Sequence, residues 1–148
     1  MSDKEKFEGF EQSLIDENEQ KYGAEMRTKY GDKAIDESNT HLKGLTQEQY
    51  NKGEHLRLEM EQVLLAALGT GNPADELAQK ACDLHRQWLC VFYPKYSREY
   101  HLGLAEMYVA DERFRANYDK IAMGCAEFLR DAINIYCGEW VRVMSDNT

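Results

Sequence analysis

Between residues 45 and 68, apolar side chains recur three or four positions apart, which is the spacing of one helix face. Thr46 is suited to cap the start of such a helix, and Gln49 three residues later can bond back to it. The apolar face comprises Tyr50, Leu56, Met60, Val63, Leu64, Ala67 and Leu68. Since Gly69 supplies a stop signal, the pattern predicts a helix from Gln47 to Leu68.

A second long helix is predicted to begin at Pro73. Asn72 is a favourable cap in front of it, and proline suits the first position of a helix. The buried stripe of this helix is expected to comprise Leu77, Ala81, Leu84, Trp88 and Phe92. Pro94 disfavours helical backbone at Tyr93, so the helix should end there.

The rest of the chain repeats the helical spacing three more times, and Ser97 can cap the first of these helices. The three faces are Tyr100, Leu104, Met107 and Tyr108; then Phe114, Tyr118 and Ile121; and, after Gly124, Cys125, Phe128, Leu129, Ala132, Ile133, Tyr136 and Trp140. No stretch alternates apolar and polar residues for long enough to make a convincing strand. The predicted fold is therefore all-α.

The first 54 residues differ from the rest in composition. Their aliphatic side chains other than alanine are Leu14, Ile15, Ile35, Leu42 and Leu45, and they contain no valine. Helical spacing is still visible in Tyr22, Met26 and Tyr30, so we expect amphipathic helices that pack weakly. We therefore divide the single domain into a conditionally ordered lid segment, residues 1–54, and a helical ligand-binding core, residues 55–148.

Charge and composition exclude several classes of protein. The net charge of -9 opposes binding of this chain to a nucleic-acid backbone. No apolar stretch approaches the roughly 18 residues that span a bilayer, and the first residues lack the features of a secretion signal, so we expect a cytoplasmic protein and no membrane partner. The four cysteines, Cys82, Cys90, Cys125 and Cys137, have no Cys-x-x-Cys spacing and are expected to be buried free thiols.

Residues with catalytic or metal-binding side chains do not form a recognisable motif. Cys82 and His85 make one pair at ligand spacing, with Cys90 and His101 nearby, but structural zinc sites use two such pairs. The acidic residues and histidine at positions 99, 101, 106 and 111 could serve as acid and base, although acid-rich helices scatter such side chains over solvated faces. We expect neither an enzyme nor a bound metal or cofactor.

Aromatic residues are densest between His85 and His101. Within these 17 residues lie Trp88, Phe92, Tyr93, Tyr96 and Tyr100, more rings than one helix face can bury. A mostly apolar cleft with a few polar tips would suit a large heterocyclic ligand. Three alternatives stay open: a tyrosine-rich core corner, a haem or small-cofactor sensor with a histidine on the iron, and a protein-binding regulatory module.

The stretch "HLGLAEMYVADERFRANYDKIAMGCAEFLRDAINIYC", with "DLHRQ" upstream, resembles the TipA-type antibiotic-recognition domain, the TipAS family. The family pattern Met-Tyr-Val-x-Asp-x-Arg-Phe is matched from Met107 to Phe114. A second pattern, Gly-x-Ala-x-Phe-Leu-Arg-Asp-Ala-Ile, resembles residues 124–133. The similarity extends more weakly to "KEKFEGF" and "MRTKYGD" in the first 54 residues.

This resemblance implies a globin-like helical domain that binds thiopeptides or other bulky drug-like antibiotics. Such domains are usually the effector half of MerR-type transcriptional activators, so contact with DNA would be made only through a MerR-type N-terminal domain that is absent here. The resemblance is equally compatible with a free-standing drug-sequestering resistance protein. In the family, the N-terminal part is similarly ordered by ligand.

Candidate ligand-binding residues follow from the aromatic density and from the resemblance together. They are Tyr30, His85, Trp88, Phe92, Tyr93, Tyr96, Tyr100, His101, Gly103, Met107, Tyr108 and Asp111. Tyr30 would come from the lid, and Asp111 is also expected to cap the helix that bears Phe114. An ungapped match places Tyr96 and Gly103 where the thiopeptide-binding prototype has cysteines, so binding is expected to be reversible.

Overall fold

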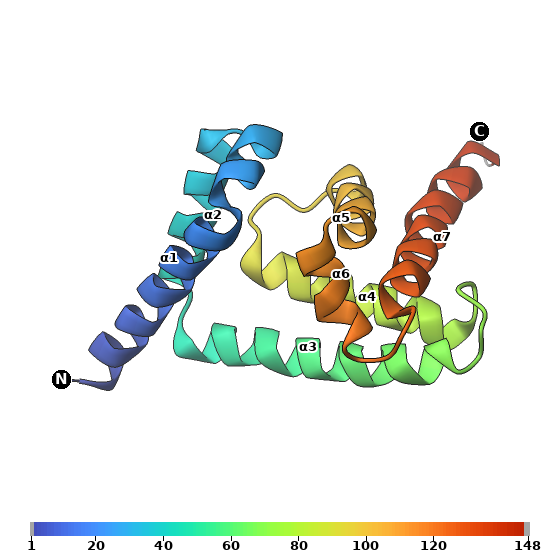
Figure 1. The fold of residues 1–148 in the computed structure, drawn as a ribbon, viewed down its shortest axis with the longest axis horizontal. Coiled ribbons are helices and arrows are strands. Elements are labelled where there is room, and N and C mark those ends of the chain that lie inside the picture. Colours follow the sequence, from blue (N-terminus) through green and yellow to red (C-terminus); the bar gives the residue numbers. More distant parts are fainter. Residues whose placement is uncertain (1, 147–148) are drawn as a thin grey trace. The chain divides into compact units, whose positions relative to one another are not determined.

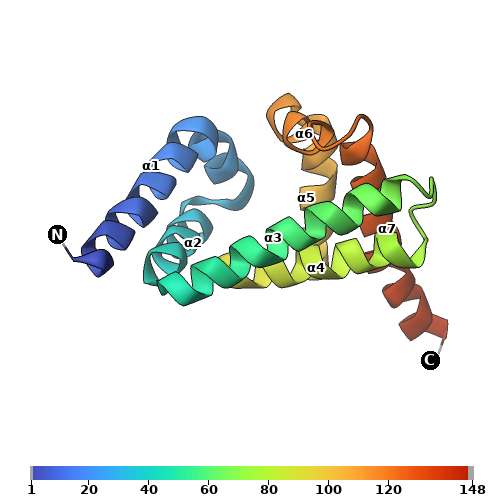
Figure 2. The ribbon, with the colours of Figure 1, turned by 90° about the horizontal axis from the view of Figure 1, so that it is seen from below.

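A computed structural model of the protein describes residues 2–146, with their side chains as far as Gly138. Seven helices follow one another within this range (Figures 1 and 2): α1 (Asp3–Tyr30), α2 (Asp32–Gly44), α3 (Gln47–Leu68), α4 (Glu76–Phe92), α5 (Arg98–Ala110), α6 (Glu112–Asp119) and α7 (Cys125–Asp146). The described residues contain no strand, which confirms the predicted all-α fold. Trp140, predicted for the last apolar face, lies outside the residues whose side chains are described.

Three predicted helix starts are confirmed by their caps. The Thr46 amide donates to the Gln49 side chain at 2.9 Å, and the Gln49 amide donates to the Thr46 hydroxyl at 3.1 Å. Ser97 Oγ accepts from the Tyr100 amide at 3.0 Å at the start of α5. Asp111 Oδ1 accepts from the Arg113 amide at 2.9 Å at the start of α6.

The predicted start of the second long helix was wrong by three residues, because two caps follow in succession. Asn72 closes a turn by accepting from the Ala74 amide at 3.0 Å, and Asp75 then caps the helix itself by accepting from the Leu77 amide at 3.0 Å. The helix therefore begins at Glu76. Ile121 is also misplaced in the prediction, since α6 ends at Asp119.

The buried face of α4 is rotated from the predicted stripe. Its buried residues are Ala78, Ala81, Cys82, Leu84, His85 and Leu89, whereas Leu77 is 39% exposed. Trp88 and Phe92 are half-buried rather than core. Ala81 and Leu84 are therefore confirmed as buried, whereas the prediction missed the buried Ala78, Cys82, His85 and Leu89.

By contacts, the chain forms two units: Met1–Gly53 with Cys90–Lys95, and Glu54–Leu89 with Tyr96–Thr148. In the first unit, α1 packs against α2. The joint between them is held by Arg27, which donates to Glu19 at 2.5 Å, Asp32 at 3.0 Å and Asp36 at 2.8 Å. These acceptors raise the pKa of Arg27 above its usual value. Charge pairing is thus the main link described in this helical hairpin.

The second unit has a continuous apolar core. α3 and α4 run side by side in opposite directions in both views, and α5 packs against α7 (Figures 1 and 2). Leu64, Leu89, Leu129 and Ile133 have no exposed surface. This unit is large enough to hold polar groups away from water.

The cysteine prediction is partly corrected. All four cysteines are free, and Cys82, Cys125 and Cys137 are buried, but Cys90 is exposed. Burial raises the pKa of the Cys125 and Cys137 thiols to about 11 each and that of Cys82 further. The three buried thiols are therefore poor nucleophiles. No helix in the described part of the chain has the length and apolar character to cross a bilayer.

Candidate functional site

Two of the predicted site residues, His85 and His101, lie stacked in the interior of the second unit. Both are fully buried, their ring centroids are 4.9 Å apart, and the ring planes differ by 21°. His85 Nδ1 lies 2.8 Å from His101 Nε2, within hydrogen-bonding distance. A direct bond between two buried imidazoles is the central feature of this site.

A tyrosine hydroxyl closes each end of the histidine pair. The Tyr96 hydroxyl lies 2.8 Å from His101 Nδ1, and the Tyr108 hydroxyl lies 3.1 Å from His85 Nε2. We call these four residues, in the order Tyr96, His101, His85 and Tyr108, the histidine network. A further hydroxyl, that of Tyr118, lies 3.5 Å from His85 Nε2. Every ring nitrogen of both histidines therefore has a partner, as buried polar groups require.

Local sequence explains how the network is positioned. His85 belongs to the buried face of α4, while His101 and Tyr108, seven residues apart, share the buried face of α5. The Ser97 cap fixes the start of α5 directly after Tyr96. At the other end of α5, the Asp111 cap starts α6, whose Tyr118 ring packs 4.7 Å from that of Tyr108.

Burial keeps both histidines neutral. It lowers the pKa of His85 well below its usual value, and the neighbouring His101 lowers it further. For His101, burial and then the positive charge of Arg86 lower the pKa to about 4. Near pH 7 each imidazole is therefore uncharged and carries a single N–H.

A second polar cluster, Asp83, Arg86 and Tyr136, lies beside the network and was not predicted from the sequence. The Tyr136 hydroxyl donates to Asp83 Oδ1 at 2.8 Å, and Arg86 Nε donates to the Tyr136 hydroxyl at 3.1 Å. The Tyr136 ring lies edge-on to His101 at 6.0 Å. Burial, then the bond to Asp83, raises the pKa of Tyr136 to about 12. The only sequence signal for it was the helical spacing of Asp83 and Arg86, since Tyr136 fitted an ordinary apolar stripe.

Five of the predicted ligand residues, His85, Trp88, Tyr96, His101 and Tyr108, lie together in the second unit. Trp88 joins the histidine network through its ring, 5.6 Å from that of His85. Tyr100, Gly103 and Met107 are half-buried positions of α5, and Asp111 is the cap between α5 and α6. Tyr30, Phe92 and Tyr93 belong to the first unit. There Phe92 packs against Tyr50 at 5.7 Å and occupies the space that a side chain at Gly53 would need.

The described residues contain no group of three or more His, Cys, Asp or Glu side chains arranged to hold a metal ion. Iron coordination by either histidine would have to break a hydrogen bond of the network, because all four ring nitrogens already have partners. A haem sensor would therefore lose binding free energy, because the former hydrogen-bond partner of the iron-bound histidine would be left buried and unsatisfied. The sequence patterns gave no sign of this cost.

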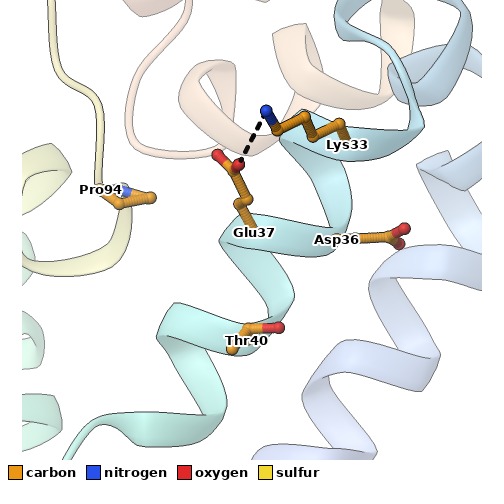
Figure 3. Close-up of a pocket in the computed structure, with 5 residues that line it drawn as sticks. All are labelled: Lys33, Asp36, Glu37, Thr40 and Pro94. Carbon is orange, nitrogen blue, oxygen red and sulfur yellow. Dashed lines mark ion pairs between the residues drawn. The ribbon is translucent and has the colours of Figure 1, made fainter.

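An open hollow of about 700 Å³ lies in the first unit. It is lined by Lys33, Asp36, Glu37, Thr40 and Pro94. Figure 3 shows Glu37 on the side of α2 toward Pro94, where it pairs with Lys33 at 4.0 Å, and Lys95 lies 3.0 Å from the same carboxylate. None of the ligand residues predicted from the sequence lines this hollow, so it gives them no support.

Comparison with known proteins finds a family that this chain matches. Residues 22–136 match the TipAS antibiotic-recognition domain. The HTH-type transcriptional activator TipA of Streptomyces coelicolor is 33% identical over 135 residues, which cover 90% of this chain and 52% of that protein. The HTH-type transcriptional activator mta of Bacillus subtilis is 28% identical over 139 residues, covering 93% of this chain and 53% of that protein. The chain thus spans about half the length of these curated relatives.

A solved structure shares the fold. It is TipAS in complex with nosiheptide, from a thiopeptide antibiotic multidrug resistance system of Streptomyces lividans, and it matches with a TM-score of 0.69 and 31% sequence identity. The match covers 82% of this chain and 87% of that chain. Since that neighbour is a helical globin-like domain, the predicted globin-like fold is confirmed.

Proposed function

The chain belongs to the TipAS antibiotic-recognition family, and from this membership we propose that it binds bulky antibiotics of the thiopeptide kind. The observation that carries the proposal is the likeness in both fold and sequence to a domain solved with nosiheptide bound. Family members serve as ligand-binding regulatory domains of transcriptional activators, and we propose a binding role without catalysis for this chain.

We propose that the ligand contacts the half-buried side of α5. Tyr100, Gly103 and Met107 of α5, and Tyr96 just before that helix, retain exposed surface. His85, His101 and Tyr108 are buried and would support these residues from the interior. Aromatic and apolar side chains with a few polar tips suit a large heterocyclic compound. Tyr30, Phe92 and Tyr93 of the first unit, together with Trp88 and Asp111, stay predictions from the sequence.

Binding is proposed to be reversible. An addition to an alkene needs an exposed, partly ionised thiol, and the three buried cysteines have raised pKa values. The structure adds one correction to that argument, because Cys90 is exposed. Reversible binding predicts that the mass of the protein after incubation with nosiheptide, measured under denaturing conditions, equals that of the untreated protein, and an added mass would point to the exposed Cys90.

Whether binding activates transcription or sequesters the drug depends on the rest of the native protein. The HTH-type relatives are about twice as long as the matched region. We propose that this domain senses the antibiotic for a transcriptional activator when it is joined to a DNA-binding half, and that it acts by sequestration when it stands alone. A reading frame that continues upstream into a basic helix-turn-helix would decide for the first role.

The test is titration of the purified chain with nosiheptide, followed by calorimetry and thermal melting. We expect saturable binding and a melting temperature that rises with ligand concentration, because a ligand of the native state stabilises it by mass action. Haemin added in a parallel titration distinguishes the sensor alternative through its absorbance. Absence of both heat and stabilisation with nosiheptide, together with a specific haem spectrum, would replace the antibiotic proposal with the haem one.

A further inference from the structure

The protons of the histidine network are constrained by its geometry. His85 Nδ1 and His101 Nε2 are 2.8 Å apart, so a single proton lies between them. Two neutral imidazoles carry one N–H each, on one of their two nitrogens. If the proton between the rings belongs to His101 Nε2, His85 must carry its own proton on Nε2. If it belongs to His85 Nδ1, His101 must carry its own proton on Nδ1.

Only two arrangements satisfy all three bonds of the network. In the first, the Tyr96 hydroxyl donates to His101 Nδ1, His101 Nε2–H donates to His85, and His85 Nε2–H donates to the Tyr108 oxygen. In the second, every donor and acceptor is exchanged, and both histidines carry the proton on Nδ1. The rings are thus both Nε2–H or both Nδ1–H.

The two ends of the network differ in access. Tyr108 is 4% exposed and both histidines are fully buried, whereas Tyr96 is half-buried. At the inner end, Tyr118 offers a second hydroxyl near His85 Nε2, so a hydrogen-bond partner is present in either arrangement. Tyr96 is consequently the one member of the network with surface to offer a ligand.

We propose that Tyr96 is a specificity-determining contact whose hydroxyl serves either as donor or as acceptor, according to the arrangement of the network behind it. In the first arrangement Tyr96 gives its proton to His101, so its oxygen can accept from an amide N–H of the ligand. In the second it accepts from His101 and can donate to a carbonyl or heteroaromatic nitrogen of the ligand. This inference rests on the proposed function and adds the chemistry of one polar contact.

Such a contact favours broad recognition. A side chain that can only donate has no hydrogen-bond partner when the ligand also presents a donor, and an unpaired buried group costs binding free energy. The network avoids this cost because both arrangements keep the three bonds and hold the same protons, one on each histidine and one on each tyrosine, so both are neutral. The low pKa of His101 is consistent with this, since a charged ring would donate from both nitrogens and block the exchange.

The first arm of the test uses the ligand-free protein. Heteronuclear NMR of ¹⁵N-histidine-labelled protein at pH 7 reports which ring nitrogens are protonated. We expect His85 and His101 to show the same tautomer, or the same averaged mixture of the two. Opposite tautomers, or a charged ring, would overturn the inference whatever ligand the protein binds.

The second arm adds nosiheptide to saturation. We expect the tautomer populations of both histidines to shift together, and Tyr96→Phe to abolish the linked shift and weaken binding roughly tenfold, the value of one hydrogen bond. Tyr136→Phe is the matched control, because it removes a hydroxyl beside His101 that bonds to Asp83 and Arg86 instead, and the linked shift should persist.

The outcomes separate the two proposals. Tight binding of nosiheptide with unchanged tautomers, or with an unaffected Tyr96→Phe variant, overturns the role of Tyr96 and leaves the antibiotic proposal standing. Failure of nosiheptide to bind the wild-type protein overturns the antibiotic proposal and the ligand contact together, while the ligand-free spectra still decide whether the tautomers are linked.

Discussion

The first unit buries two apolar side chains among its described residues, Ile15 and Leu45, whereas the second buries a continuous set that includes Leu64, Leu129 and Ile133. Buried polar groups occur in both units. In the first unit Glu11 is buried, and one of its carboxylate oxygens has no hydrogen-bond partner among the described residues. Burial, and then the nearby negative charge of Glu8, raises the pKa of that carboxyl. In the second unit the buried histidines have partners at every ring nitrogen.

From this difference we expect the second unit to supply most of the stability and the first unit to respond to the ligand. Apolar burial contributes roughly 25 cal/mol per Å², so most of the folding free energy should reside in the second unit. In the first unit, an aromatic cluster of Phe7, Phe10, Tyr50 and Phe92 adds apolar contact. The link between α1 and α2 is made by partly exposed charges, which contribute little individually and are screened by salt. A segment of that kind is suited to order when a ligand supplies the missing contacts, as the sequence predicts for residues 1–54.

The largest effect is expected from the core of the second unit. Leu129→Ala removes a fully buried side chain and should lower the free energy of unfolding by about 3 kcal/mol, since buried leucines lose 2–5 kcal/mol. Ile15→Ala in the first unit should cost about 1 kcal/mol, because a thin core collapses around the gap. Urea unfolding followed by circular dichroism measures both, and equal losses would contradict the comparison.

An effect of similar size is expected from acid. The pKa of His101 is about 4 when folded and near 6.5 when unfolded, so the unfolded state binds more protons between these values. The stability this histidine contributes is complete above pH 6.5 and is lost as the pH falls to 4. From 1.36 kcal/mol per pKa unit, the loss is about 3 kcal/mol, and the lowered pKa of His85 adds to it.

Urea unfolding between pH 7 and pH 4 measures this dependence. His101→Gln is the control, since glutamine can donate and accept but does not titrate, and it should flatten the slope across this window. A variant with the slope of the wild type would show that other groups, chiefly carboxylates, carry the acid sensitivity.

Amide exchange compares the units directly. In the ligand-free protein we expect residues 10–45 to exchange faster than residues 55–136, because opening them exposes little apolar surface. Ordering on binding would cost roughly 2–5 kcal/mol of the interaction energy, and nosiheptide should slow exchange in the same residues. Equal protection of both ranges without ligand would contradict a conditionally ordered segment.

Much of the fold could be predicted from the sequence because its signals are local. The caps at Thr46, Ser97 and Asp111 satisfy amides two or three residues away, so residue type and spacing determine them. The start of α4 was misjudged because Asn72 and Asp75 are both good caps, and only the folded structure selects between them.

The candidate site was less predictable, because its partners come from different helices. His85 and His101 were recognised as candidates, but the bond between them joins residues 16 positions apart. Tyr136 is 53 positions from the Asp83 to which it donates, and nothing in its own helix distinguishes it from a core aromatic residue. Contacts over such separations depend on how helices pack, which periodicity does not specify.

A smaller effect, about 1 kcal/mol, is expected at the joint between α5 and α6. Asp111→Ala removes the cap and should destabilise the second unit by this amount, whereas Asp111→Asn keeps an acceptor and should cost little. The Arg113 guanidinium, bonded to Asp111, lowers the pKa of its carboxyl to about 2. Equal losses in both variants, measured by urea unfolding, would assign the effect to this ion pair rather than to the cap.

The smallest effect is expected at the corresponding joint of the first unit, between α1 and α2. Here the cap position is Gly31, which offers no side chain, and Arg27 joins the helices instead by bonding to Asp32 and Asp36 beyond the turn. Arg27→Met keeps the aliphatic stem and removes the charge, so it should speed amide exchange in residues 32–44 at low salt. Because surface ion pairs are screened, wild type and variant should converge as salt rises toward 1 M, whereas Asp111→Ala should keep its effect. A difference between wild-type and Arg27→Met exchange that survives high salt would mean that the stem of Arg27, and not its charge, holds the joint.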